Sequence, residues 1–118
     1  MRALVRAAEQ QVRAFATYGG RILFGTDVGY LSRYDPTREY ELMAQAGLDF
    51  SAILSSLTTA PAQEFGFGER QGQLAAGFDA DIVVIDGDPV RDIRSLGKVR
   101  LTLKRGQFLY PTSRTRAP

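Results

Sequence analysis

The sequence predicts a mixed α/β fold, because helical and strand patterns occupy different parts of its 118 residues. Residues 2–17 carry apolar side chains at helical spacing. Residues 35–65 contain three further helix starts, and from residue 72 glycines separate short apolar runs of strand length. A helix followed by a glycine turn and a short buried strand is also half of an α/β repeat. We therefore expect a helical part over residues 1–68 and strands over residues 69–110.

The first helix is expected over residues 2–17, because its apolar side chains repeat at the spacing of a helix. They are Leu4, Val5, Ala8, Val12 and Phe15, with most charges opposite them. The pair Gly19-Gly20 ends this helix. The apolar run 22–24 that follows is too short for a helix, and we expect it to form a buried parallel strand over residues 21–26.

Three shorter helices are predicted between residues 35 and 65. Asp35 is a suitable N-cap, with Pro36 at the first helical position, where its missing N–H costs nothing. Asp49 is expected to cap the next helix. Thr59 begins the third, and Phe65 is expected to point inward at its end. Each predicted start therefore depends on a residue with a known capping preference.

The last third of the sequence has the pattern of strands. Residues 82–85 (IVVI) are all β-branched, which predicts a strand buried on both faces. Apolar and polar residues alternate over 99–104, and Arg105-Gly106 is a suitable turn, so residues 98–110 are expected to form a hairpin. Residues 111–118 contain two prolines and are expected to be disordered.

The composition excludes several classes of catalytic site. The chain contains no histidine and no cysteine. Without them it cannot carry a Ser-His-Asp triad, a thiol nucleophile, a thiolate metal site or an HExxH zinc helix. Any chemistry of this chain alone must use carboxylates, Arg, Lys, Tyr, Ser and Thr.

The charges indicate a soluble protein without an obvious charged partner. Fifteen basic residues stand against thirteen acidic ones, a formal net charge of +2. Residues 98–118 are basic and contain no acidic residue, so this segment could contact the phosphates of a nucleic acid. No recognition motif accompanies these charges, and we expect a solvated strand pair instead of a nucleic-acid site. No stretch is apolar enough for a signal peptide or a membrane span, which favours a cytoplasmic protein.

Asp27 is the candidate functional residue. It directly follows the predicted strand, between Gly25 and Gly29, and the carboxyl ends of strands are where α/β proteins bind ligands. A carboxylate there becomes an effective base beside a metal ion, which lowers the pKa of bound water to about 7. The alternative is a turn or capping role, which is the commoner use of an Asp after a strand.

Four sequence blocks in order resemble a known family. They are 19–27 (GGRILFGTD), 46–48 (AGL) preceded by Glu39 and Leu42, 57–62 (LTTAPA) and 72–89 (GQLAAGFDADIVVIDGDP). Together they resemble the C-terminal third of a metal-dependent amidohydrolase of the imidazolonepropionase-like branch, which includes Xaa-Pro and Xaa-Arg dipeptidases. The similarity covers residue 1 to about residue 110. It implies that these are the last part of a TIM barrel, over residues 1–68, and the C-terminal strands of a composite β-sandwich, over 69–110.

The resemblance also implies a role for Asp27. It matches the family's Asp at the end of barrel strand eight, which binds the catalytic metal, most often zinc, and transfers the proton during hydrolysis of C–N bonds in cyclic amides or dipeptides. Tyr30 and Arg33 follow it and are candidates for substrate contact. Helix packing is the alternative for Tyr30, and a surface charge is the alternative for Arg33.

The chain departs from the family where the other metal ligands would lie. The family's HxH pair, its bridging Lys or Glu and its later His residues have no counterpart here. We therefore expect a fragment of a longer hydrolase that holds no metal and is inactive by itself. Strands without neighbours also predict a homo-oligomer or pairing with the missing N-terminal portion. The alternative function is a non-catalytic module that works by self-association or by binding a partner.

Overall fold

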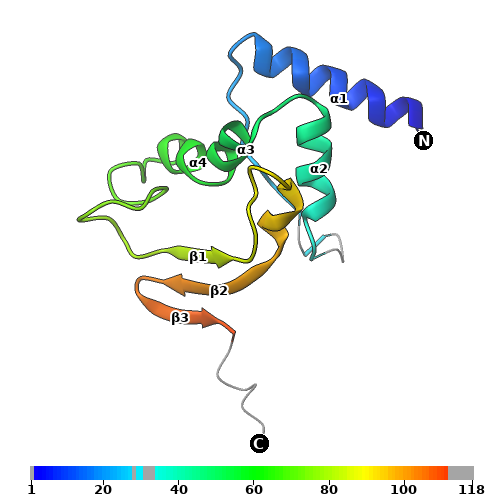
Figure 1. Ribbon diagram of the computed structural model, residues 1–118. Coiled ribbons are helices and arrows are strands. Elements are labelled where there is room, and N and C mark those ends of the chain that lie inside the picture. The colour runs from blue at the N-terminus through cyan, green and yellow to red at the C-terminus, as the bar shows by residue number, and fades with distance from the viewer. Residues whose placement is uncertain (1, 28, 31–33, 112–118) are drawn as a thin grey trace, which may run out of the picture.

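Helices lead into a small sheet in the computed structural model, which describes residues 2–27, 29–30 and 34–111 (Figure 1). The elements are helices α1 (Arg2–Thr17), α2 (Thr37–Gln45), α3 (Phe50–Leu57) and α4 (Thr59–Glu64), strand β1 (Ile82–Ile85), the 3₁₀ helix η1 (Ile93–Gly97), and strands β2 (Val99–Lys104) and β3 (Gln107–Tyr110). The mixed α/β class is thus confirmed. The disordered tail predicted for 111–118 falls, apart from Pro111, outside the described residues.

Helix α1 ends as its glycines predict. Gly19 has a φ of +79°, and its N–H donates to the Ala16 carbonyl at 3.0 Å. The Gly20 N–H donates to the Phe15 carbonyl at 2.8 Å, and together these two bonds form a Schellman motif. Arg13 holds α1 against the end of α2, because its guanidinium donates to the carbonyl oxygens of Gln45 and Ala46, both at 2.9 Å.

An aspartate lies at the start of each of the next two helices, but the N-cap predicted at Asp35 is wrong, because Pro36 takes that position. Asp35 Oδ1 accepts from the Thr37 N–H at 2.9 Å, and α2 starts at Thr37, so Pro36 takes the N-cap position in place of the predicted first helical one. Asp49 caps α3 as predicted, accepting from the Ala52 N–H at 2.8 Å. The inward position predicted for Phe65 is wrong. It is the C-cap residue, just after the last residue of α4, and is 66% exposed.

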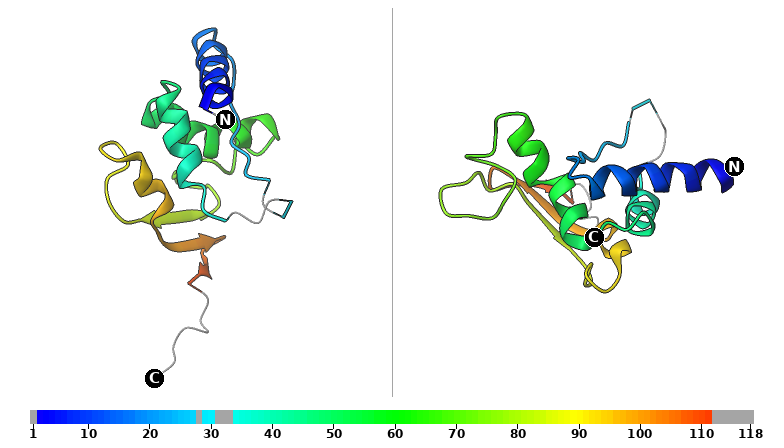
Figure 2. Two further views of the ribbon diagram at one scale, coloured as in Figure 1. Left: turned by 90° about the vertical axis from the view of Figure 1, so that its right-hand side faces the viewer. Right: turned by 90° about the horizontal axis from the view of Figure 1, so that it is seen from above.

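One core lies among the helices. Its buried members are Tyr40, Ala46, Leu48 and Ile53, against which the partly buried Val12, Ala16, Ile22, Phe24, Met43, Leu57, Ile93 and Leu96 pack. These residues come from α1, the segment that follows it, α2, the link from α2 to α3, α3 and η1. None of them comes from the sheet. The helical layer therefore has its own core, and the strands lie beside it (Figures 1 and 2).

The parallel strand predicted over residues 21–26 is absent. This segment has no regular structure, and the Phe24 N–H donates to the Ser56 carbonyl of α3 at 3.0 Å. The alternation of burial survives, since Ile22 and Phe24 are half-buried whereas Leu23 is exposed. A parallel strand forms only beside a neighbouring strand, and the strands of the described residues pair with one another elsewhere.

The sheet is antiparallel, with strand order β1-β2-β3. Arg105 and Gly106 have φ values of +50° and +76°, as in a type I′ turn, so the predicted hairpin is confirmed. The prediction that residues 82–85 are buried on both faces is wrong, because Val83 is 58% exposed and Val84 is also exposed. Burial on both faces needs a covering layer on each side, and the helical core provides neither.

No helix in the described ranges combines the length and the hydrophobicity that a membrane-spanning segment requires.

Candidate functional site

The segment that leads to Asp27 is held at three points by the helical layer. The Arg21 guanidinium forms an exposed ion pair with Glu64 at 2.9 Å. Beyond the Phe24–Ser56 backbone bond described above, the Phe24 ring packs against Tyr40, with ring centroids 5.3 Å apart and planes tilted by 36°. These contacts fix the chain as far as Phe24, three residues before Asp27.

Asp27 itself lies in a turn and is exposed. Its backbone is in the left-handed region, with a φ of +50°, and its carbonyl accepts from the Tyr30 N–H at 3.0 Å. Left-handed backbone is uncommon for a residue with a side chain, although Asp tolerates it better than most. The carboxylate has no hydrogen-bond or ion-pair partner among the described residues. Within the described part of the chain, the carboxylate is therefore available to another group.

The residues predicted to contact substrate beside Asp27 have different outcomes. Tyr30 is exposed, so its side chain is available, and its packing on the following helix is not observed. Arg33 lies outside the described residues, and its role stays a prediction. Tyr40, on the helix that follows, is a core residue. Burial, and then the charge of Asp35, raises the pKa of its hydroxyl above the ordinary value of a tyrosine.

The described residues do not fit a metal site of their own. Zinc in proteins takes about four ligands from Cys, His and carboxylates. The chain has neither of the first two residue types, and the described residues contain no group of three or more acidic side chains that could hold a metal. Asp27 alone supplies at most two oxygens. The donor set therefore does not fit the resident metal that the resemblance implies.

Most other carboxylates near the sheet have structural partners. Asp79 accepts from the side chains of Gln71 and Arg70, both at 3.0 Å. Asp81 binds the Lys104 ammonium and accepts from the Arg105 N–H at 2.9 Å. The hydrogen bonds of Gln71 and then Arg70 lower the pKa of Asp79, and those of Lys104 and then Arg105 lower the pKa of Asp81. Asp79 thus ties the loop before β1 to residues 70–71, and Asp81 ties it to the β2–β3 turn, as turn residues and not as a catalytic pair.

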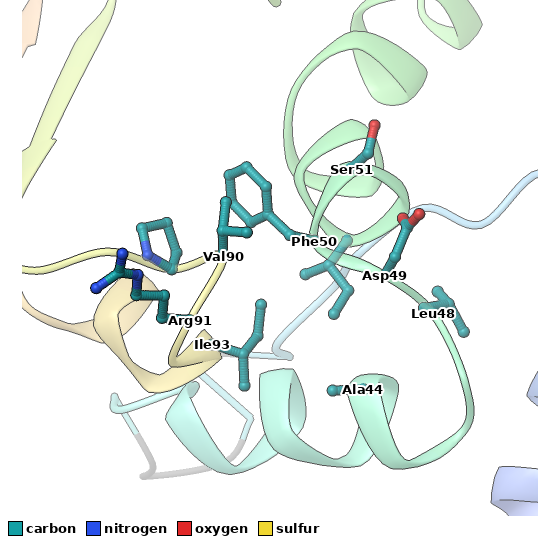
Figure 3. Close-up of a pocket in the computed structure, with 10 residues that line it drawn as sticks. Ala44, Leu48, Asp49, Phe50, Ser51, Val90, Arg91 and Ile93 are labelled. Atoms are coloured by element: carbon teal, nitrogen blue, oxygen red, sulfur yellow. The ribbon is translucent and has the colours of Figure 1, made fainter.

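An apolar groove of about 580 Å³ lies at the junction of α2, α3 and η1, where no sequence motif predicted one. Val90 and Ile93 on one side face Phe50 on the other (Figure 3). Asp49, at the rim of the groove, caps α3. Arg91 forms an ion pair with Asp88, with 3.5 Å between Arg91 Nε and Asp88 Oδ2. No local pattern could have revealed it, because residues 44–53 and 89–93 meet only in the tertiary structure. Asp27 does not line this groove.

The order of these elements can be compared with known proteins. A family model described as "Amidohydrolase family" matches residues 3–109 of the chain. The chain belongs to the amidohydrolase family. The match runs from α1 into β3, so the helices, the Asp27 segment and the sheet all lie within the region shared with other amidohydrolases.

Two curated amidohydrolase relatives match parts of the chain. Amidohydrolase tasK of Hapsidospora irregularis is 59% identical over 44 residues, 37% of this chain and 4% of that protein. Imidazolonepropionase of Thermoplasma acidophilum is 34% identical over 61 residues, 49% of this chain and 15% of that protein. The chain therefore spans a small fraction of the length of these relatives.

Solved amidohydrolase structures agree with the branch that the motifs indicated. A Xaa-Pro dipeptidase with bound methionine has a TM-score of 0.77 at 28% identity, over 85% of this chain and 25% of that one. A prolidase complexed with N-methylphosphonate-L-proline has a TM-score of 0.68 at 26% identity, over 86% of this chain and 26% of that one. The chain fits an amidohydrolase of the imidazolonepropionase and Xaa-Pro dipeptidase branch.

Proposed function

We propose that this chain is the C-terminal portion of a metal-dependent amidohydrolase that hydrolyses C–N bonds of cyclic amides or dipeptides. Asp27 is its catalytic carboxylate. The observation that carries the proposal is the environment of Asp27, which lies where the family has its catalytic Asp. Its carboxylate is exposed, lacks a partner among the described residues and follows an anchored segment. An uncommon backbone conformation of this kind is concentrated at functional sites. Tyr30 and Arg33 are the candidates for substrate contact.

The same proposal holds that these 118 residues are incomplete for catalysis. The donor set cannot hold zinc, so the remaining ligands must come from another part of the fold. The solved relatives support this, because the region that matches this chain makes up about a quarter of each. In this proposal residues 1–68 belong to a TIM barrel and residues 69–110 to a β-sandwich.

The partly exposed sheet also supports incompleteness. Ile82, Leu103 and Phe108 lie opposite one another across the three strands, and Val84 lies opposite Leu101 on the same face. This face is entirely apolar, yet none of its residues belongs to the core. A sheet with an apolar face is stable only when another layer covers it. We therefore infer that this face packs against a part of the hydrolase that the chain does not span.

Zinc binding and hydrolysis by the 118-residue chain test the proposal. Calorimetric titration with zinc should give no stoichiometric binding, and Xaa-Pro dipeptides should remain intact in its presence. In a longer polypeptide that joins this chain to the remaining barrel, Asp27→Asn should lower kcat by about 10²–10⁴-fold, the range for loss of a proton-transferring group. The exposed Glu69→Gln is the matched control and should leave kcat unchanged. Near-normal turnover of the Asp27→Asn variant would refute the assignment.

A non-catalytic module is the second candidate function. The observation that favours it is the exposure of apolar side chains on α1, which have no cover among the described residues. This candidate would be favoured over the first if no longer polypeptide that contains this chain hydrolysed C–N bonds, and if the chain associated specifically with itself or with a partner.

A further inference from the structure

Gly97, the last residue of η1, packs against the start of α2 (Figure 1). A Cβ atom on Gly97 would lie 2.1 Å from Thr37 Oγ1 and 3.4 Å from Thr37 Cβ. The backbone of Gly97 is outside the left-handed region, so a residue with a side chain could adopt its conformation. Glycine is therefore required here by the space that the Thr37 hydroxyl occupies.

The Thr37 hydroxyl cannot leave this space without losing a hydrogen bond. It donates to Asp35 Oδ1 at 2.6 Å, and the Thr37 N–H donates to the same oxygen at 2.9 Å. Rotation of the Thr37 side chain away from Gly97 would break the hydroxyl bond. A methyl group added at position 97 must therefore either break this bond or push the start of α2 away.

The first turn of α2 connects this contact to the segment before Asp27. Tyr40 lies about one helical turn after Thr37 and is buried in the core. Its ring packs against the ring of Phe24, which precedes Asp27 by three residues. A displaced start of α2 would move the Tyr40 ring, and with it the contact that holds the Asp27 segment.

The 3₁₀ helix η1 also meets α2 through the core. Ile93 and Leu96 pack against the cluster that contains Tyr40. Packed interiors have low compressibility, so contacts at two places on α2 hold it firmly against η1. Both sides of these contacts are formed by described residues of this chain, so they need no further part of the hydrolase.

We propose that Gly97 is a positioning residue for Asp27. Its close approach to Thr37 sets the place of the start of α2 and, through the ring of Tyr40, the place of the Asp27 segment. This inference deepens the proposed hydrolytic function and rests on the role given there to Asp27. Gly97 acts through α2 and not by contact with the reacting atoms.

Amide hydrogen exchange of the 118-residue chain, followed by NMR, tests whether Gly97 holds the segment. Gly97→Ala should accelerate exchange of the Phe24 N–H, which donates to the Ser56 carbonyl, by about tenfold or more. The Ile53 N–H, which donates to the Asp49 carbonyl within the helical layer, should keep its rate. An unchanged Phe24 rate overturns the proposal, and so does equal acceleration of both amides, which would indicate general destabilisation.

A second substitution should rescue the first. In the double variant Gly97→Ala with Thr37→Ala the hydroxyl is absent, and the two Cβ atoms would lie 3.4 Å apart, an ordinary contact. The Phe24 exchange rate should then return to that of Thr37→Ala alone, and failure to return overturns the proposal. Gly68→Ala is the matched control, because its added Cβ would lie 3.2 Å from Gln63 Cγ, on a flexible side chain, and it should leave the Phe24 rate unchanged.

Turnover of the longer polypeptide that joins this chain to the remaining barrel separates this inference from the function on which it rests. Gly97→Ala should lower kcat by about tenfold or more with KM unchanged, since a misplacement of about 1 Å can cost about 10²-fold. Normal kcat in Gly97→Ala, where Asp27→Asn is impaired, overturns the positioning role. Normal kcat in both variants refutes the role of Asp27 instead, and the Phe24 exchange rate still decides whether Gly97 holds the segment.

Discussion

The aspartates of this chain differ in what surrounds their carboxylates. Asp79, Asp81 and Asp92 each accept hydrogen bonds from neighbouring residues, and these bonds lower their pKa values. Asp27 is displayed without such partners among the described residues. The first group holds loops in place, whereas Asp27 is available for a ligand or a reacting group. The bonds to Asp79 and Asp81 come from residues 8 to 24 positions away, whereas those to Asp92 come from Arg94, 2 positions along the chain.

Asp81→Asn is expected to destabilise the fold at neutral pH. The folded-state pKa of Asp81 is lowered, first by the Lys104 hydrogen bond and then by that of the Arg105 N–H. Its contribution is therefore fully present above the unfolded pKa of about 3.9 and is lost as the pH falls through the folded value. Urea midpoints of wild type and variant should differ at pH 7 and converge in acid. Glu69→Gln is the control, and an equal difference at every pH would contradict the argument.

Local capping decides where the helices of this protein start. Asp35 and Asp49 each accept a backbone N–H at the beginning of a helix, and Gly19 ends α1 in a left-handed conformation. These interactions involve residues within four positions of one another. The helices were accordingly predictable within one or two residues, as was the hairpin, whose turn depends on two adjacent residues.

Asp49→Ala should remove the cap of α3. The loss of the bond to the Ala52 N–H is expected to lower the free energy of unfolding by about 1 kcal/mol, the usual cost of an N-cap deletion. Urea denaturation measures it, and Ser51→Ala, at an exposed position of the same helix, is the control. Equal stability of the two variants would mean that the capping bond contributes nothing.

The molecule as a whole is divided into a helical layer with a core and a sheet without one. Ile53 is fully buried at the centre of that core, whereas Phe108 lies on the apolar face of the sheet and remains 76% exposed. The stability of the described structure should therefore be concentrated in the helices. We expect a further layer to cover the apolar face of the sheet.

Substitutions in the two layers should have very different effects. Ile53→Ala is expected to cost about 2–5 kcal/mol, because it leaves a cavity in a packed core. Phe108→Ala should change the free energy of unfolding by less than about 0.5 kcal/mol, as for a surface position. Chemical denaturation of the two variants measures both values. A large loss for Phe108→Ala would show that the sheet face is already covered in solution.

The candidate site was predictable in part. The position of Asp27 after an apolar run and between glycines could be recognised from the residues, and so could the lack of histidine and cysteine in the chain. Its exposure and its lack of a partner could not, because they depend on how residues 21–27 lie against α3 and α2. The groove beside η1 had no sequence signal for the same reason.

The sequence by itself determined the helix caps, the turns and the chemical inventory, since each depends on residue identity or on neighbours a few positions away. Only the tertiary structure decided that residues 21–26 form no strand and that residues 82–85 are not buried. Strand pairing and burial on two faces require partners from distant segments, and a short local pattern predicts the need for such partners without supplying them.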